Sequence, residues 1–258
     1  MIVDLTKRCV LITGASSGIG RACADVFAAR GCRLLLAARR IERLEESAAA
    51  LRERHGAEVL TVALDVRDRE AVEGWVDGLP ESWRDIDILV NNAGLARGLA
   101  PLHEGDVTDW EEMIDTNVKG LLWVTRSVLP GMVDRCGGHI INIGSVAGHE
   151  VYPGGSVYCA TKHAVAALNR CLGIDTLGTG VRVSSVDPGM VETEFSLVRF
   201  HGDAERADGV YDGIEALQSE DVAEAVIFCA TRPPHANVRE MILMPAAQAT
   251  AVHSHRTR

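Results

Sequence analysis

The amino-acid sequence predicts an α/β fold, with one seven-stranded parallel sheet flanked by helices in a doubly wound arrangement. Short apolar runs alternate along the chain with amphipathic stretches, and this alternation is typical of parallel strands joined by covering helices. The chain has 258 residues, of which 47% are hydrophobic and 24% are charged. Because this length can bury one sizeable core, we expect a single domain over residues 1–258.

Seven apolar runs are the candidate strands, each short enough for a buried strand. They are CVLIT (9–13), RLLLA (33–37), VLTVAL (59–64), DILVNNAG (87–94), HIINIGS (139–145), VRVSSVDP (181–188) and EMILMP (240–245). A helical pattern follows the first run, where residues 19–27 carry apolar side chains at i, i+3, i+4 and i+7. Residues 190–217 do not follow this alternation of strands and helices. An insertion of that kind often serves as a lid, so we expect these residues to form a loop over a binding site.

The composition excludes several classes of protein. A net charge of −10 argues against broad binding to nucleic acid or anionic membranes. There is no apolar run of membrane-spanning length and no signal segment, and the seven cysteines form no C-x-x-C pair. We therefore expect a cytoplasmic protein with reduced thiols. No metal site is expected, because His253 and His255 lack a carboxylate or cysteine partner and fit a frayed polar end better.

The first predicted strand runs into the glycine-rich turn TGASSGIG at residues 13–20, and a helix is predicted to follow at once. Glycines allow a tight turn and close approach of a ligand, while a helix N-terminus offers unpaired N–H groups to a pyrophosphate. The turn therefore predicts a dinucleotide site, with a ligand-free turn as the alternative. The residues expected to bind the cofactor here are Gly14, Ser16, Ser17, Gly18, Ile19 and Gly20.

Two adjacent arginines end the second predicted strand. NAD-binding folds usually place an acid there to bind the ribose 2′-hydroxyl, whereas this chain has Arg39 and Arg40. Guanidinium groups bind a 2′-phosphate through charge-assisted hydrogen bonds, so the pair predicts NADP. The alternative is a solvated basic turn whose arginines pair with Glu42 or Glu45, and it applies more to Arg40 than to Arg39, which we expect to make the main choice of cofactor.

The stretch YCATK places Tyr158 and Lys162 four residues apart on a predicted helix, with Ser145 at the end of the preceding strand. Positions i and i+4 share a helix face, so the hydroxyl and the ammonium look into the same space. A neighbouring cation favours the phenolate, and we expect Lys162 to lower the pKa of Tyr158 toward the working range.

Over its whole length the chain resembles the short-chain dehydrogenases/reductases. The resemblance is carried by TGASSGIG, LDV at 64–66, NNAG at 91–94, DTNVKG at 115–120, INIGS at 141–145, YCATK and DPGMVET at 187–193. It implies a Rossmann-type fold, a catalytic tetrad and further cofactor contacts. The tetrad is Asn117, Ser145, Tyr158 and Lys162, and the further cofactor contacts are Asp65, Val66, Asn92, Ala93, Gly94, Tyr158, Lys162, Pro188, Gly189, Val191 and Thr193.

A finer resemblance, to the NADP-dependent 3-hydroxy acid dehydrogenases and sulfoacetaldehyde reductases, rests on scattered segments such as AARRIERL, LDVRDREAV, TEFSLVRFHGD and MILMPAAQA. It implies a small anionic substrate, either a 3-hydroxy acid such as serine or a semialdehyde. In the reductive direction Tyr158 would donate a proton to the substrate oxygen and Ser145 would hydrogen-bond it, while Asn117 would position a water beside Lys162. Two alternatives stay open: a ketoacyl, steroid or sugar reductase, and a non-catalytic NADP-binding regulator.

The expected substrate contacts are Ser145, Tyr152, Tyr158 and Arg199. Arg199, in the segment EFSLVRF, would grip the acidic end of the substrate, with Arg97 as a rival for that role. Pairing of Arg199 with Asp203 or Glu205 is the structural alternative. The resemblance also implies a homotetramer, in which the apolar tail after Pro245 would dock on a partner chain.

Overall fold

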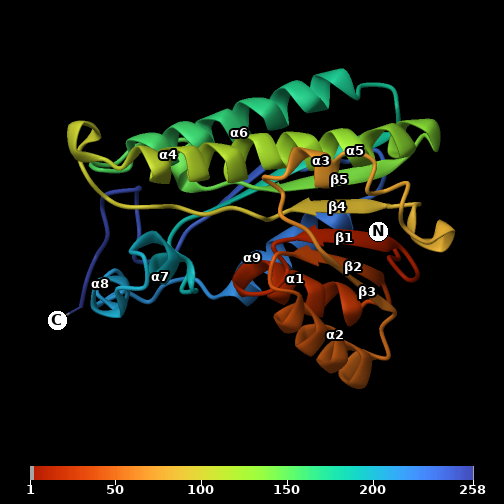
Figure 1. Ribbon diagram of the computed structural model, residues 1–258, viewed down its shortest axis with the longest axis horizontal. Coiled ribbons are helices and arrows are strands. Elements are labelled where there is room, and N and C mark those ends of the chain that lie inside the picture. The colour runs from red at the N-terminus through yellow and green to blue at the C-terminus, as the bar shows by residue number, and fades with distance from the viewer. Residues whose placement is uncertain (1–2, 258) are drawn as a thin grey trace.

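The core of the protein is a sheet of seven parallel strands, shown by a computed structural model that describes residues 3–257 (Figure 1). The strand order is β3-β2-β1-β4-β5-β6-β7, and every neighbouring pair is parallel. This confirms the predicted α/β class and the seven strands. The strands are β1 (Cys9–Thr13), β2 (Arg33–Ala38), β3 (Val59–Ala63), β4 (Ile88–Asn91), β5 (Gly138–Ile143), β6 (Val181–Pro188) and β7 (Glu240–Leu243).

Strand β4 is shorter than the apolar run that predicted it. It ends at Asn91, where the backbone amides of Asn92 and Ala93 donate to Thr13 Oγ1. The side-chain amide of Asn92 also donates to the carbonyl oxygens of Thr13 (2.9 Å) and Gly14 (3.2 Å). The rest of the NNAG stretch therefore leaves the sheet and lies against the turn that follows β1. A pattern of apolar residues does not show where such a side-chain bond ends a strand.

Helices cover both faces of the sheet, with α4, α5 and α6 on one side and α1, α2 and α9 on the other (Figure 1). Alternate residues of β1 divide between two cores: Val10 and Ile12 pack with α1 and α9, whereas Cys9 and Leu11 pack with α5. The helices are α1 (Gly18–Ala28), α2 (Ile41–His55), α3 (Arg69–Val72), α4 (Val107–Ile114), α5 (Leu121–Asp134), α6 (Ser156–Asp175), α7 (Phe195–Arg199), α8 (Ala204–Asp208) and α9 (Ser219–Ala230). None of the helices in the described residues 3–257 is long and apolar enough to cross a membrane.

The strand order reverses between β1 and β4, because the chain first builds β2 and β3 on one side of β1 and then returns to its other side. In sheets of this kind the connections after the two central strands diverge and leave a crevice at their carboxyl ends. The glycine-rich turn after β1 and the NNAG stretch after β4 both lie at this edge.

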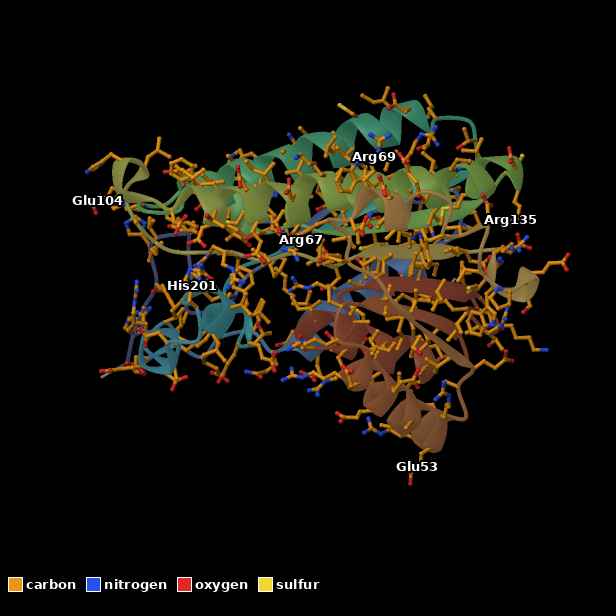
Figure 2. The ribbon with its side chains drawn as sticks, viewed as in Figure 1. Glu53, Arg67, Arg69, Glu104, Arg135 and His201 are labelled. Carbon is orange, nitrogen blue, oxygen red and sulfur yellow. The ribbon has the colours of Figure 1, made fainter. Side chains whose placement is uncertain are left out.

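Residues 190–217 form a segment with two short helices, α7 and α8, bounded by a bridge between Val191 and Leu217. Two hydrogen bonds join it to the loop after β4: the Gly98 amide donates to the Arg199 carbonyl (2.8 Å), and Arg97 Nη1 donates to the Val198 carbonyl (2.6 Å). Figure 2 labels His201 in the same segment, and its Nε2 lies 3.1 Å from Asp109 Oδ2.

The C-terminal tail packs on residues of its own chain. Arg256 donates hydrogen bonds to the carbonyls of Val210 and Asp212, and the Thr257 amide donates to the Gly213 carbonyl at 2.7 Å. These contacts are made by the polar end of the tail. The apolar residues 246–252, which predict docking on a partner chain, do not take part in them, and Val252 stays 52% exposed, so that docking stays a prediction.

Candidate active site

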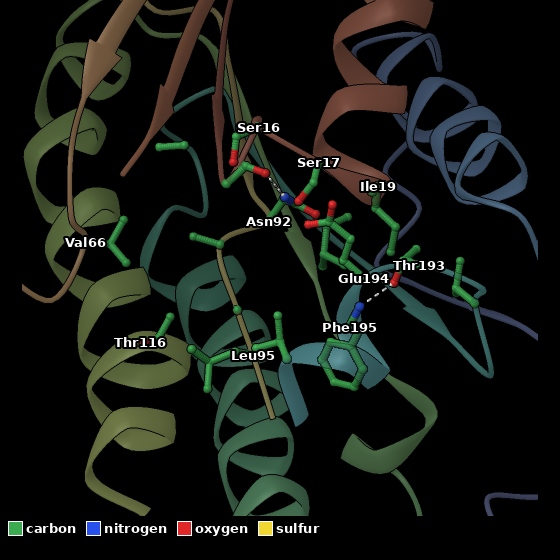
Figure 3. Close-up of a pocket in the computed structure, with 18 of the residues that line it drawn as sticks. Ser16, Ser17, Ile19, Val66, Asn92, Leu95, Thr116, Thr193, Glu194 and Phe195 are labelled. Carbon is green, nitrogen blue, oxygen red and sulfur yellow. Dashed lines mark hydrogen bonds between the residues drawn. The ribbon is translucent and has the colours of Figure 1, made fainter. Parts of the chain in front are cut away.

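A cleft of about 330 Å³ opens at the carboxyl edge of the sheet. Figure 3 shows part of its lining, which comes from the turn after β1, the loops after β3 and β4, and the segment after β6. Of the cofactor contacts expected from the sequence, only Gly20 is not in the lining. The expected residues that line the cleft are Gly14, Ser16, Ser17, Gly18, Ile19, Arg39, Arg40, Asp65, Val66, Asn92, Ala93, Gly94, Tyr158, Lys162, Pro188, Gly189, Val191 and Thr193.

The glycine-rich turn is packed so closely that Gly14 and Gly20 leave no room for a Cβ atom. A Cβ on Gly14, whose φ is +65°, would lie 2.9 Å from the Ala93 Cα, and one on Gly20 would lie 2.5 Å from the Gly14 carbonyl oxygen. Thr13 Oγ1 accepts the amides of Asn92 and Ala93, both at 3.1 Å, which joins the turns after β1 and β4. This cradle leaves the N-terminus of α1 facing the cleft, as a pyrophosphate site requires.

The two arginines at the end of β2 both reach the cleft, but their partners are not the acids expected from the sequence. Arg39 Nη1 lies 3.8 Å from Glu112 Oε1 on α4, and Arg40 Nη1 lies 3.2 Å from Glu194 Oε2. Neither arginine pairs with Glu42 or Glu45 among the described residues. About half of each arginine side chain is exposed, so both guanidinium groups remain accessible to a ligand.

Asp65 lies at the wall of the cleft after β3 and is held by its near neighbour Arg67, whose Nη2 lies 2.6 Å from Asp65 Oδ2. Arg67 lies near the middle of the molecule in Figure 2 and also reaches Glu112 at 3.1 Å. Burial raises the pKa of Asp65, but hydrogen bonds from Arg67 lower it by more, so the pKa lies below its usual range. Asp65 is therefore ionised and fixed at neutral pH.

Tyr158 and Lys162 face the cleft from α6, and Ser145 faces it from the turn after β5. The Lys162 Nζ donates to the Ile143 carbonyl at 3.0 Å and lies 5.9 Å from the centre of the Tyr158 ring. Ser145 Oγ accepts the Ala147 amide at 3.1 Å, which fixes the turn that presents it. The structure thus brings three members of the predicted tetrad to one end of the cleft.

The pKa of Tyr158 lies above its ordinary value, which differs from the expectation that Lys162 lowers it. Burial is the largest effect and raises the pKa, because the phenolate loses its hydration. Arg199 and a hydrogen bond with Ser145 act in the opposite direction. Burial lowers the pKa of Lys162 to about 8, while Asp187 raises it. The cation that favours the Tyr158 phenolate is therefore Arg199.

Asn117, the fourth predicted tetrad member, is buried but does not line the cleft. It lies in a π-helical turn (Asp115–Gly120) between α4 and α5. Its Oδ1 accepts the Leu95 amide at 2.8 Å, and its Nδ2 donates to the Leu95 carbonyl (2.8 Å) and to Thr161 Oγ1 (3.1 Å). The side chain therefore joins the loop after β4 to α6 next to Lys162.

Arg199 lies among three aromatic rings, with its Cζ 5.7 Å from the ring centre of Tyr152, 5.2 Å from Tyr158 and 5.1 Å from Phe195. Its Nη2 donates to the Tyr152 hydroxyl at 2.8 Å, and its buried Nε has no partner among the described residues. No acid in that part of the chain pairs with Arg199, and Asp203 instead caps α8 through the Arg206 amide. Neither Arg199 nor Tyr152 lines the main cleft. Tyr152 and Tyr158 line an adjoining cavity of about 240 Å³.

The rival cation Arg97 already has an acid partner, Glu112. Its Nε lies 2.7 Å from Glu112 Oε2, and its Nη1 holds the Val198 carbonyl. Hydrogen bonding by Arg97 lowers the pKa of Glu112, so this ion pair persists at neutral pH. Arg97 thus connects the loop after β4 to residues 190–217, whereas Arg199 keeps an unpaired donor.

Sequence reasoning missed part of the lining: Ala38, Leu64, Leu95, Thr116, Ile143, Gly144, Glu194, Phe195 and Val198. Ala38 and Ile143 end strands, so the rule that ligands bind at carboxyl ends of parallel strands could have found them. No sequence signal marked Glu194. Its position depends on how residues 190–217 fold over the cleft.

Comparison with known proteins agrees with this geometry. A family model described as short chain dehydrogenase matches residues 8–202, and the chain belongs to this family. It is 51% identical to the NADP-dependent 3-hydroxy acid dehydrogenase YdfG of Salmonella typhi over 94% of this chain and 96% of that one. It is 50% identical to sulfoacetaldehyde reductase 2 of Chromohalobacter salexigens over 93% of this chain and 95% of that one.

Among solved structures, the closed form of serine dehydrogenase complexed with NADP⁺ matches with a TM-score of 0.90 and 48% identity, covering 96% of this chain and 100% of that one. Serine dehydrogenase from Escherichia coli matches with a TM-score of 0.80 and 44% identity, covering 93% of this chain and 99% of that one.

Proposed function

We propose that this protein is an NADP(H)-dependent oxidoreductase that transfers hydride between the nicotinamide and a small anionic hydroxy acid or aldehyde. The observation that carries the substrate class is Arg199, a cation without an acid partner among the described residues, beside the hydroxyl-bearing ring of Tyr158. The candidate substrates are 3-hydroxy acids such as serine and semialdehydes such as sulfoacetaldehyde, which are named for relatives about 50% identical to this chain.

The residues of the cleft fit a phosphorylated dinucleotide. Gly14 and Gly20 let the turn pack closely on Asn92 and Ala93, and the turn lines the cleft at the N-terminus of α1, where a pyrophosphate would approach. Arg39 and Arg40 supply the positive charge for a 2′-phosphate at the end of β2, and Asp65 and Val66 would border the adenine. The bound dinucleotide would supply the hydride donor or acceptor, which no side chain of the protein can provide.

In the reductive direction Tyr158 donates its proton to the substrate oxygen as negative charge develops there. Its raised pKa keeps the proton on the hydroxyl at neutral pH, so the acid is in the correct form before reaction. Ser145 stabilises the same oxygen by a hydrogen bond, and the Lys162 ammonium adds positive charge at this end of the cleft. We propose that Asn117 fixes the backbone around a water that connects Lys162 to solvent.

The anionic end of the substrate would be bound by Arg199, assisted by the Tyr152 hydroxyl. A guanidinium stays charged at any working pH, and its planar fork matches two oxygens of a carboxylate or sulfonate. Because Arg199 and Tyr152 lie beside Tyr158, which borders both the cleft and the adjoining cavity, we propose that they turn toward the substrate when it binds. Residues 190–217 are the proposed substrate loop of a single domain that spans residues 1–258.

The experiment that tests this function measures NADPH oxidation with small semialdehydes and NADP⁺ reduction with serine and other 3-hydroxy acids. In Arg199→Ala we expect catalytic efficiency to fall about 10²-fold or more for anionic aldehydes and little for a small neutral aldehyde. Only the anionic substrates use the guanidinium contact. Tyr211→Phe, which changes another polar contact of the same loop, is the control. An equal loss of Arg199→Ala on both substrate types would assign Arg199 to the architecture of the loop.

We also propose a homotetramer in the cytoplasm. Large apolar side chains on the edge strand β7 and on α9 stay exposed in the single chain, with Ile242 at 52% and Phe228 at 46%. Exposed apolar groups on neighbouring elements favour a subunit interface. All seven cysteines are free, which suits a reducing compartment.

A further inference from the structure

Glu194, at the start of α7, forms ion pairs with two arginines of the β2–α2 region across the mouth of the cleft. Its Oε2 lies 3.2 Å from Arg40 Nη1 and 3.3 Å from Arg40 Nη2. Arg43, near the start of α2, binds both carboxylate oxygens through its Nη1, at 2.8 Å and 3.0 Å. These contacts connect the proposed substrate loop to the part of the protein proposed to read the 2′-phosphate.

Arg40 also contacts the glycine-rich turn, because its Nη2 donates to Ser17 Oγ at 3.0 Å and lies 3.4 Å from Ser16 Oγ. Glu194 and Ser17 line the same cleft, and both are labelled in Figure 3. The guanidinium of Arg40 therefore lies over the place where phosphates of a dinucleotide would approach, with a carboxylate bound to it.

We infer that Glu194 competes with the cofactor 2′-phosphate for Arg40, and that Arg43 strengthens NADP binding by holding Glu194 when Arg40 changes partner. The inference rests on the proposed function, in which Arg40 binds that phosphate. A phosphate and a carboxylate on one guanidinium repel each other, and the phosphate with its higher charge is the stronger partner. Glu194 has a second partner within reach, because its contacts to Arg43 are already the shorter ones.

Glu194 stays ionised at neutral pH. Hydrogen bonding by Arg43, and more weakly by Arg40, lowers the pKa of this carboxyl below its usual range. The three side chains are 43–46% exposed, so solvent screens each pair and moderate effects are expected. NAD lacks the 2′-phosphate and would leave the Arg40–Glu194 pair in place.

The test is titration of the purified protein with NADPH and with NADH, followed by cofactor fluorescence without substrate. In Glu194→Gln the competitor charge is gone, so NADPH should bind about 3- to 10-fold more tightly while NADH changes less than about 2-fold. Glu192→Gln removes a carboxylate two residues away and serves as the control for general charge. Weaker NADPH binding in Glu194→Gln, or equal changes for both cofactors, would overturn the competition.

Arg43→Ala should weaken NADPH binding by about 3- to 10-fold, because Glu194 is then left to Arg40 alone. The same substitution in a Glu194→Gln background should have almost no effect, since no carboxylate remains to be held. Arg52→Ala, farther along α2, removes an equal charge as the control. If Arg43→Ala weakens NADPH binding as much in the Glu194→Gln background as in the wild type, Arg43 acts on the cofactor directly and the inference is wrong.

Arg40→Ala tests the premise that Arg40 binds the 2′-phosphate, separately from the proposed reaction. If its removal leaves the preference for NADPH over NADH unchanged, Arg40 is not the phosphate ligand, and that premise and the inference fail together. The proposed reaction itself is read from turnover with anionic substrates, which these binding titrations do not involve.

Discussion

Burial and charge act in opposite directions on Tyr158, the proposed proton donor. Its side chain borders two cavities and is 8% exposed, so the phenolate is poorly solvated and the hydroxyl keeps its proton. Arg199, with its Cζ 5.2 Å from the ring centre, is the cation that partly offsets this burial. The same arginine thus contributes both to the proposed substrate site and to the acidity of the donor.

Replacement of Tyr158 by Phe removes the proton donor and keeps the shape of the wall. We expect turnover to fall by about 10²- to 10⁴-fold, the usual contribution of general acid–base catalysis, with NADPH affinity nearly unchanged. Steady-state rates and cofactor titration on the same preparation measure both quantities. Near-normal turnover of the folded variant would exclude Tyr158 as the donor.

Burial of the Lys162 ammonium lowers the free energy of unfolding. Its pKa is lowered from 10.5 to about 8, mainly by burial. Because the folded-state pKa lies below the unfolded one, both states are protonated below about pH 8 and the full cost is present there. Above that pH the folded state loses its proton first, so the free energy of unfolding rises until about pH 10.5. The cost at neutral pH is about 3 kcal/mol.

Lys162→Met should therefore inactivate the protein and stabilise it. We expect a gain of about 1 to 2 kcal/mol at about pH 7, since about 1 kcal/mol is lost with the hydrogen bond to the Ile143 carbonyl. Urea unfolding measures the difference in free energy of unfolding between the variant and the wild type, at equal concentration and at about pH 7 and about pH 9.5. This difference should be smaller at the higher pH. If the difference in free energy of unfolding does not change with pH, Lys162 is not a buried ammonium.

At the scale of elements, the turn from β1 into α1 depends on the loop after β4. The two are joined by Thr13 and Asn92, and neither would keep its position if a side chain entered the turn. Gly20 does not line the cleft, yet a Cβ there would lie 2.5 Å from both Asn92 Nδ2 and the Gly14 carbonyl oxygen. Its contribution to the cofactor site is therefore the close packing of helix and strand.

Gly20→Ala should lower the free energy of unfolding by about 1 to 3 kcal/mol, the usual cost of overpacking, and weaken NADPH binding as the turn shifts. Gly173→Ala on α6 is the matched control, because a Cβ there would meet no described atom within 4 Å beyond its own helix backbone and chain neighbours. In Gly173→Ala the free energy of unfolding should rise by about 0.5 to 1 kcal/mol, because alanine has the higher helix propensity. Thermal unfolding with and without NADPH compares them, and equal behaviour of the two variants would contradict the packing argument.

At the scale of the whole molecule, β7 forms one edge of the sheet and leaves Ile242 exposed. An uncovered strand edge with apolar residues is a common site of association. The polar end of the C-terminal tail packs on the 190–217 segment of its own chain. Docking of the apolar tail residues 246–252 on a partner chain stays a prediction, and β7 and α9 provide the further support for a tetramer.

We expect light scattering at micromolar concentration to give four times the chain mass of 27.7 kDa. Ile242→Lys should shift the population toward smaller species, because a charge would be buried at the proposed interface at a cost of several kcal/mol. Lys119→Ala, an exposed change on another element, controls for surface charge. A wild-type monomer would contradict the proposed assembly.

The sequence by itself determined the α/β class, the seven strands and the family, because these depend on local patterns. Apolar runs of strand length, a glycine turn ahead of a helix and the i, i+4 spacing of Tyr158 and Lys162 are all features of neighbouring residues. Comparison with known proteins confirmed the family, and the fold confirmed the sheet. The roles assigned to the site residues stay predictions, among them those of Asn117, Ser145, Tyr158, Lys162 and Arg199.

Only the tertiary structure decided which charges meet. Glu194 lies 154 residues from Arg40 in the sequence, and Glu112 lies 15 residues from Arg97, yet each pair is in contact. The structure also reversed the expected direction for the pKa of Tyr158, since burial depends on how loops and helices close over the ring. The physical reason is that ion pairing and desolvation act through space, over a few ångströms, between segments whose separation along the chain leaves no local pattern.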